Sequence, residues 1–207
     1  MDLAAALKGF YAGGNHKFGT VYAASGCTRR TPSNGRLDWA LVKPLDDTRI
    51  GRNTYTRPLE NSGRKCRFHT PCCTDFWRTL QQPCPNNKPS HDQRLFVRGA
   101  FSGETIGQLS LAKANLTLGD GQPHSEELVF LRSHTSSCYG RLLVGEGDAG
   151  AVVSDQNRRA MGMLLGQKLS PLIPFHAYGF MTPIEDVFND IKLLSGGLVT
   201  DVRIAMD

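Results

Sequence analysis

GEGDAGAVV, residues Gly145 to Val153, joins a glycine-rich turn to the start of an apolar strand. Glycine adopts positive φ at little steric cost, so a turn of this composition can direct its backbone N–H groups outward. The apolar residues 151–153 that follow are typical of a strand in a protein core. The stretch therefore predicts an exposed turn that leads directly into a buried strand.

Short apolar runs bounded by turn residues continue on both sides of this stretch. Between residues 94 and 180 there are seven of them: RLFVRGAF, TIGQLSLAKANLTL, EELVFLRS, RLLVG, GAVVSD, AMGMLLGQ and HAYGFM. Two further runs, FGTVYAA and LDWALVKPL, lie between residues 18 and 45. Many short strands with glycine between them are typical of a barrel or a sandwich. The sequence therefore predicts an all-β fold.

One helix is expected, near residues 183–194, in the segment TPIEDVFNDIKLLSGG. Thr182 as N-cap and Glu185 three residues later form a capping box, and Pro183 suits the first helical position. Gly196 and Gly197 supply the stop. The apolar residues at helical spacing share one face: Ile184, Val187, Phe188, Ile191 and Leu194.

Differences in composition and in the spacing of apolar runs along the chain suggest three regions. Residues 1–45 hold the first strand-like runs, and residues 94–207 hold the later strands and the helix. Residues 46–93 between them are polar and carry four of the six cysteines. We therefore expect a partial N-terminal barrel, a cysteine-containing connection and a complete C-terminal barrel.

Composition excludes several classes of protein. With 40% hydrophobic and 21% charged residues in a chain of 207, the protein is globular and not disordered. The net charge of +5 comes from scattered basic pairs, so we expect no nucleic-acid partner. No apolar run is long enough to span a membrane, and the first residues lack the features of a signal peptide. These observations favour an intracellular protein and leave its oligomeric state open.

A compact cluster, CRFHTPCC, places Cys66, His69 and Cys72 within a few residues, and Cys84 follows. These four side chains could reach one zinc ion. The usual zinc pattern has two ligand pairs separated by a dozen or more residues, and this cluster is more compressed. We therefore expect no metal and no cofactor, with the cysteines as thiols or local disulfides.

Three further stretches of the sequence are considered together with the Gly147-Asp148-Ala149-Gly150 turn. LDWALV, from Leu37, places an aspartate directly before apolar strand residues. VRGAFSGETIGQL combines a strand with a glycine-marked turn. After GDAGAVVSD come RAMGMLLGQ and AYGFMTPIEDVF, two strands and then the helix.

Together, residues from about 21 to 194 resemble the chymotrypsin-like (trypsin-like) serine peptidase family. The resemblance is closest to poorly characterised domains, often fungal, that carry Gly-Asp-Ser-Gly-Ala and end in a Thr-Pro-capped helix. It implies a double β-barrel whose first barrel is incomplete, followed by the C-terminal helix.

The resemblance also implies residue roles. Asp38 corresponds to the carboxylate that orients the catalytic base, although a surface aspartate opening a strand is the alternative. Gly147 and Ala149 correspond to the residues whose backbone N–H groups bind the oxyanion. Ala149 stands at the position of the nucleophilic serine and has no hydroxyl. Gly162 and Gly166 bracket the strand that would face the backbone of a substrate.

The alanine at position 149 is one departure from the family pattern, and the general base is the second. His16 is the one histidine before Asp38, and its surroundings, GGNHKFG, lack the apolar strand end that the role requires. His16 is thus a weak candidate base, and a loop histidine is the alternative. We expect the chain to begin inside the first barrel, without its opening strands and the base.

The sequence accordingly predicts a serine-peptidase-like protein that is catalytically inactive as given and that retains a cleft for a peptide or protein ligand. The alternatives are a regulatory interaction domain without a substrate cleft, and a form that would be an active serine endopeptidase if complete and serine-containing. Cys138 as a displaced nucleophile is disfavoured, because proteases of this fold that use cysteine place it at the serine position.

Overall fold

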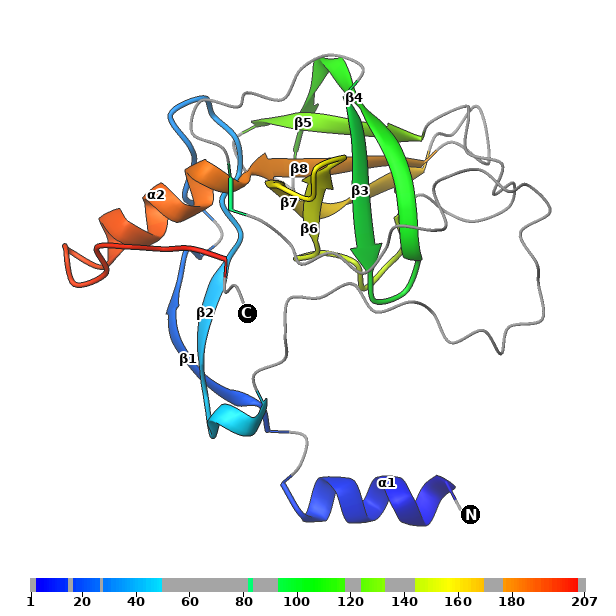
Figure 1. The fold of residues 1–207 in the computed structure, drawn as a ribbon, viewed down its shortest axis with the longest axis vertical. Helices are drawn as coiled ribbons and strands as arrows, with labels where there is room; N and C mark the ends of the chain where they lie inside the picture. The colour runs from blue at the N-terminus through cyan, green and yellow to red at the C-terminus, as the bar shows by residue number, and fades with distance from the viewer. Residues whose placement is uncertain are drawn as a thin grey trace.

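The computed structural model describes residues 3–14, 17–26, 28–49, 82–83, 93–117, 124–132, 144–169 and 177–204. Within them the chain forms a strand-rich body with one helix near each end (Figure 1). The predicted all-β class is confirmed, and so is the C-terminal helix.

The body is a closed antiparallel barrel with the strand order β3-β4-β5-β8-β7-β6. Its strands are β3 (Arg94–Gly99), β4 (Gly103–Leu116), β5 (Ser125–Arg132), β6 (Val152–Asp155), β7 (Ala160–Leu169) and β8 (Ala177–Pro183). Six of the seven runs expected here therefore form strands. The remaining run, RLLVG, lies largely outside the described residues, and its last two residues are not in a strand.

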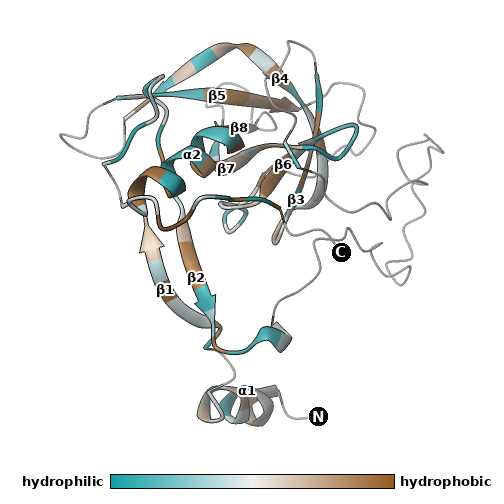
Figure 2. Cartoon of the chain, turned by 60° about the vertical axis from the view of Figure 1, so that its left-hand side comes forward, coloured by the Kyte–Doolittle hydropathy of each residue, from teal (hydrophilic) through white to brown (hydrophobic). Residues whose placement is uncertain are grey.

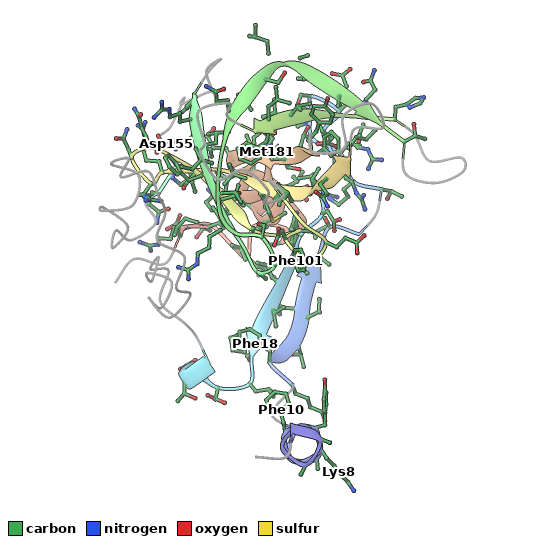
Figure 3. All side chains as sticks on the ribbon, turned by 90° about the vertical axis from the view of Figure 1, so that its right-hand side faces the viewer. Lys8, Phe10, Phe18, Phe101, Asp155 and Met181 are labelled. Atoms are coloured by element: carbon green, nitrogen blue, oxygen red, sulfur yellow. The ribbon has the colours of Figure 1, made fainter. Side chains whose placement is uncertain are left out.

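Alternation along the strands fills the barrel. In β3 the buried residues Leu95, Val97 and Gly99 alternate with more exposed neighbours, as a strand with one face in the core requires. Figure 3 shows Met181 inside the barrel, where it is fully buried like Phe130 of β5. The barrel core thus rests on side chains from every strand of the barrel.

Before the barrel, β1 (Gly19–Ala24) and β2 (Ala40–Pro44) pair antiparallel as a two-stranded sheet. In Figure 1 this ribbon extends away from the barrel. Among the residues described before the barrel, these are the only strands, and the predicted partial N-terminal barrel stays a prediction. Val21 and Tyr22 of β1 are exposed apolar side chains. Figure 2 shows hydrophobic and hydrophilic segments along both strands.

The C-terminal helix α2 (Ile184–Leu194) packs against the segment that leads into β2. Leu37 and Trp39 join Val187 and Ile191 in a second buried cluster. The helix ends at Ser195, and Gly196 follows with a φ of 61°, so the predicted stop is confirmed.

The predicted capping box is wrong. The N-cap of α2 is Pro183, and no side chain caps the helix. Thr182 is fully buried in β8, and its hydroxyl donates to the carbonyl of Arg36 at 2.6 Å. The hydroxyl is therefore used to hold the N-terminal segment and not the helix end.

An N-terminal helix, α1 (Leu3–Ala12), and a short 3-10 helix, η1 (Asp47–Arg49), were not expected from the sequence. The residues of α1, LAAALKGFYA, include strong helix formers such as alanine and leucine, which is a signal that could have been used. No helix in the described part of the chain is long and apolar enough to cross a membrane.

Candidate functional site

The loop 145–151 consists of two successive turns anchored to the barrel. The N–H of Asp148 donates to the carbonyl of Gly145, and the N–H of Ala151 donates to the carbonyl of Asp148. The N–H of Gly150 donates to the carbonyl of Leu164 in β7 at 2.8 Å. The expected tight turn is therefore present, and it leads directly into β6.

Asp148 is the internal anchor of this loop. Its side chain is 1% exposed. It accepts hydrogen bonds from the backbone N–H groups of Gly145 at 2.6 Å and Phe101 at 2.7 Å. The N–H of Ser102 adds longer contacts, at 3.2 and 3.3 Å to the two carboxylate oxygens. The carboxylate thus ties the loop to the β3–β4 hairpin.

These donors control the ionisation of Asp148. Burial by itself acts to raise the pKa of the carboxyl group, because the charged form loses its hydration. The hydrogen bonds from Gly145, Ser102 and Phe101 outweigh burial and hold the pKa of Asp148 below its usual value. Asp148 is therefore a carboxylate at neutral pH.

Two glycines make room for this arrangement. A Cβ at Gly99 would lie 2.2 Å from the carboxyl carbon of Asp148. A Cβ at Gly145 would lie 2.3 Å from the ring of Phe101, whose side chain is otherwise exposed at the end of the barrel (Figure 3). A side chain at Gly99 would therefore displace the buried carboxylate, and one at Gly145 would displace the exposed ring of Phe101.

Gly147 and Ala149 lie on the exposed side of the loop. Gly147 has a φ of 94°, a conformation in which a Cβ would be strained. Within the described residues, no group accepts a hydrogen bond from the N–H of either residue. Both residues are therefore exposed, and their N–H groups have no acceptor in the part of the chain that the structure describes.

Asp38 lies in the segment before β2, between the buried residues Leu37 and Trp39. Its side chain is 56% exposed and forms an ion pair with Arg36 at 3.3 Å. In the part of the chain that the structure describes, no hydrogen bond or ion pair links Asp38 to the loop 145–151. The role of Asp38 as an orienting carboxylate stays a prediction.

The main chain next to Asp38 is held by the barrel. Besides the Thr182 contact, the N–H of Arg36 donates to Oε1 of Glu127 at 2.8 Å. Glu127 is 1% exposed, and burial raises the pKa of its carboxyl group although Arg30 and Arg36 oppose the shift. Sequence reasoning missed Glu127, because it lies in an otherwise ordinary strand.

The strand β7 has two different edges. One edge pairs with β8 along most of its length, from Gly162 to Leu169. The other pairs with β6 only as far as Met163, and Leu164 continues the contact with the loop. Beyond that point, from Leu165 to Leu169, no described residue pairs with this edge.

The two glycines predicted to face a substrate lie at different places on β7. Gly162 is buried and pairs with Val153 on one side and Pro183 on the other. Gly166 pairs with Phe180 and lies in the half of β7 whose second edge has no described partner. The open half of the strand thus contains Gly166 and not Gly162.

The remaining candidates lie outside the described residues: His16, Cys66, His69, Cys72, Cys84 and Cys138. His124 is described, and its Nδ1 lies 2.8 Å from the hydroxyl of Thr117 at an exposed position. The described residues contain no group of three or more histidine, cysteine, aspartate or glutamate side chains that could hold a metal ion.

No protein-family model and no curated protein sequence matches the chain. Among solved structures, it is similar to a glutamic acid specific serine protease at 14% identity, covering 86% of this chain and 71% of that one with a TM-score of 0.48. It is similar to a Cellulomonas bogoriensis chymotrypsin at 10% identity, with coverages of 92% and 98% and a TM-score of 0.48. It is also similar to the MamO protease domain of Magnetospirillum magneticum at 13% identity, with coverages of 56% and 51% and a TM-score of 0.32. These likenesses to serine proteases of low sequence identity concern the fold.

Proposed function

We propose that the chain is a serine-peptidase-like protein that binds extended peptides without hydrolysing them. The observation that carries the proposal is the loop 145–151. Gly147 and Ala149 present N–H groups without a described acceptor, in a turn held by the buried Asp148. A methyl group stands where acyl transfer would need a hydroxyl.

The chemistry that remains is binding. Nucleophilic catalysis needs a group that attacks the carbonyl and a base that removes its proton, and Ala149 cannot be the former. Backbone donors act differently, since they need no side chain at position 149. Two N–H groups can still bind a ligand oxygen as an oxyanion hole does.

The half of β7 whose second edge has no described partner supplies a second element of the proposed site. An extended peptide can add to an unpaired strand edge through main-chain hydrogen bonds. The edge from Leu165 to Leu169 begins where the contact between Leu164 and the loop ends. A peptide bound there would approach Gly147 and Ala149 at one end.

A binding experiment tests this proposal. Fluorescent octapeptides with acetylated and amidated ends are titrated with the protein, and anisotropy reports binding. We expect dissociation constants on the order of 10–100 µM for a small interface of this kind. Backbone N-methylation of a bound peptide removes its strand-pairing donors and should abolish the signal.

A pair of glycine variants locates the site. Gly147→Ala strains a backbone with a φ of 94° and should weaken peptide binding. Gly197→Ala meets similar strain at a φ of 89° beyond the end of α2, and it should not. Equal binding by both variants, or no binding of any peptide by the unchanged protein, would contradict the proposal.

The second candidate is an interaction domain without a peptide cleft, and the β1–β2 ribbon favours it. Val21 is 67% and Tyr22 64% exposed, and Phe18 is also exposed on this ribbon (Figure 3). Exposed apolar patches mark interaction surfaces. If Val21→Lys abolishes association with a protein ligand while Gly147→Ala has no effect, this candidate is the better description.

A further inference from the structure

A cavity lies between α2 and the segment that follows it. After Gly196 and Gly197 the chain turns back beside the helix (Figure 1). Residues of the helix and of this returning segment line a cavity of about 570 Å³, a volume within the range of small-molecule sites. None of its described lining residues belongs to the loop 145–151 or to β7, so the cavity is separate from the peptide site proposed above.

Part of the cavity lining is apolar and held in place. Phe188 of α2 and Val202 of the returning segment line the cavity, and both pack against the buried cluster that contains Trp39. The side-chain amide of Gln82 holds the returning segment, because its Nε2 donates to the carbonyl of Ile204 and its Oε1 accepts the N–H of Ile204 at 3.0 Å. The cavity is therefore formed by contacts of the protein itself, as most small-molecule sites are.

The charged residues of the lining balance one another. Asp201 and Arg203 form an ion pair at 3.1 Å. Glu185 and Lys192 of α2 also line the cavity, and neither side chain has an ion pair or a hydrogen bond with a described residue. The cavity thus offers a ligand one carboxylate and one ammonium group, together with the apolar side chains of Phe188 and Val202.

The spacing of these two groups sets the length of a ligand that could contact both. Glu185 and Lys192 are two turns apart on α2, which separates them by about 10 Å along the helix axis. An extended peptide advances about 3.3–3.6 Å per residue, so roughly three residues span this distance. A ligand of this length needs a positive group at one end and a negative group at the other.

We infer that the cavity binds peptides of about three residues with both ends free, the α-ammonium group on Glu185 and the α-carboxylate on Lys192. An apolar middle side chain would contact Phe188 and Val202. A zwitterion suits a lining whose two carboxylates and two cations sum to zero charge. The inference goes beyond the proposed function, because the octapeptides that test that function have blocked ends and carry neither terminal charge.

Glu185 and Lys192 have a second physical role, which the test must separate from binding. Glu185 lies in the first turn of α2 and Lys192 in the last, where their charges complement the helix dipole. Stabilisation of the helix predicts no selectivity for the ends of a peptide. Selectivity that depends on these two side chains therefore distinguishes a binding site from a stabilised helix.

Four forms of the tripeptide Ala-Leu-Ala test the inference: with both ends free, with an acetylated N-terminus, with an amidated C-terminus, and with both ends blocked. Titration is followed by the backbone amide NMR signals of α2 and of residues 201–204. We expect a dissociation constant on the order of 0.1–1 mM for the free peptide. Each blocked end should weaken binding about fivefold, the upper end of the range for an exposed ion pair.

Two variants assign the orientation of the peptide. Glu185→Gln should remove the preference for a free amine and keep the preference for a free carboxylate, whereas Lys192→Gln should do the reverse. Glu126→Gln and Lys113→Gln are the matched controls, because they remove the same charges from an exposed ion pair on the barrel. Both controls should keep both preferences.

The remaining outcomes overturn the inference. Equal affinities of all four peptides would show that the ends are not recognised, and no binding of the free tripeptide would show that the cavity is not such a site. Preferences that persist in Glu185→Gln and Lys192→Gln would place the peptide elsewhere. Loss of tripeptide binding in Gly147→Ala would assign it to the loop 145–151, whereas failure of the blocked octapeptides alone would overturn the proposed function and leave this inference standing.

Discussion

The carboxylate of Asp148 accepts the backbone N–H of Phe101 at 2.7 Å, and this contact joins the loop 145–151 to the β3–β4 hairpin. The two residues are far apart in sequence, and Asp148 is almost completely buried. The loop that contains the exposed residues Gly147 and Ala149 is therefore held by a buried, hydrogen-bonded carboxylate.

Replacing Asp148 by asparagine should destabilise the protein. The amide keeps one acceptor oxygen but turns an NH2 group toward backbone donors, so at least one buried N–H loses its partner. We expect Asp148→Asn to lower the free energy of unfolding by about 2–3 kcal/mol, the scale of hydrogen bonds to a buried charge. Urea denaturation measures it, with Asp201→Asn at an exposed position as the control. Equal stabilities of the two variants would contradict the role of Asp148.

Gly99→Ala should act through the same contact without changing any polar group. The new Cβ would lie 2.2 Å from the carboxyl carbon of Asp148, so the hairpin must move away from the loop. Overpacking of this kind costs about 1–3 kcal/mol. Gly9→Ala is the matched control, because it lies in α1 with open space around its Cβ and should be neutral or stabilising. Thermal unfolding of both variants distinguishes them.

The pKa shifts of Glu127 and Asp148 give opposite pH dependences. The pKa of Asp148 is lowered on folding, so its stabilising contribution is present above its unfolded value of 3.8 and is lost as the pH falls below that value. The pKa of Glu127 is raised, so its ionisation destabilises the fold above its folded pKa. That penalty is relieved as the pH falls toward the unfolded value of 4.5.

Glu127→Gln isolates the second effect. The amide oxygen can still accept the N–H of Arg36, and the variant has no charge to bury. We expect the stability of the variant relative to the unchanged protein to be more favourable at pH 7 than at pH 4. Urea denaturation at both values measures the difference, in which the contribution of Asp148 cancels. A difference that is independent of pH would show that burial does not control Glu127.

The sequence predicted the barrel because the apolar residues of each strand, such as Leu95 and Val97, alternate with the period of the strand itself. The turn at Gly147 could also be predicted from the sequence, because its conformation depends on the residues next to it. Thr182 shows where local rules fail. Its spacing to Glu185 matches a capping box. In the structure, however, the hydroxyl donates to the carbonyl of Arg36, which is distant in the sequence.

The contacts that hold the site together could not be predicted in the same way. Glu127 contacts Arg36, 91 positions away in the sequence, and Asp190 of α2 contacts Arg29, 161 positions away. Such pairs leave no periodic pattern, because each depends on how strands and helix are placed in space. The point on β7 where pairing with the described residues of β6 and the loop ends could not be predicted either, since a strand sequence does not say where its neighbour ends.

Asp190 should be essential for attaching the N-terminal segment to α2. Its carboxylate accepts from Nε of Arg29 at 3.0 Å and from Nε1 of Trp39 at 3.0 Å, and it is almost fully buried. Because Arg29 is about one-third exposed, we expect Asp190→Ala to cost about 2–3 kcal/mol, less than for a fully buried pair. With Trp77→Phe as background, Trp39 fluorescence should shift to longer wavelength. An unchanged spectrum and stability would contradict this role.

Restoring a hydroxyl with Ala149→Ser tests whether the missing nucleophile is the only obstacle to catalysis. A serine in this loop reacts with a fluorophosphonate only if a base removes its proton. Among the described residues the one histidine is His124, whose Nδ1 contacts Thr117 at the exposed β4–β5 end. The sequence offers His16 as a weak candidate base, in surroundings that lack an apolar strand end. We expect neither the unchanged protein nor Ala149→Ser to be labelled, while circular dichroism shows both to be folded. Labelling of the variant alone would reveal a working base, and its loss in the double variant with His16→Ala would identify that base as His16.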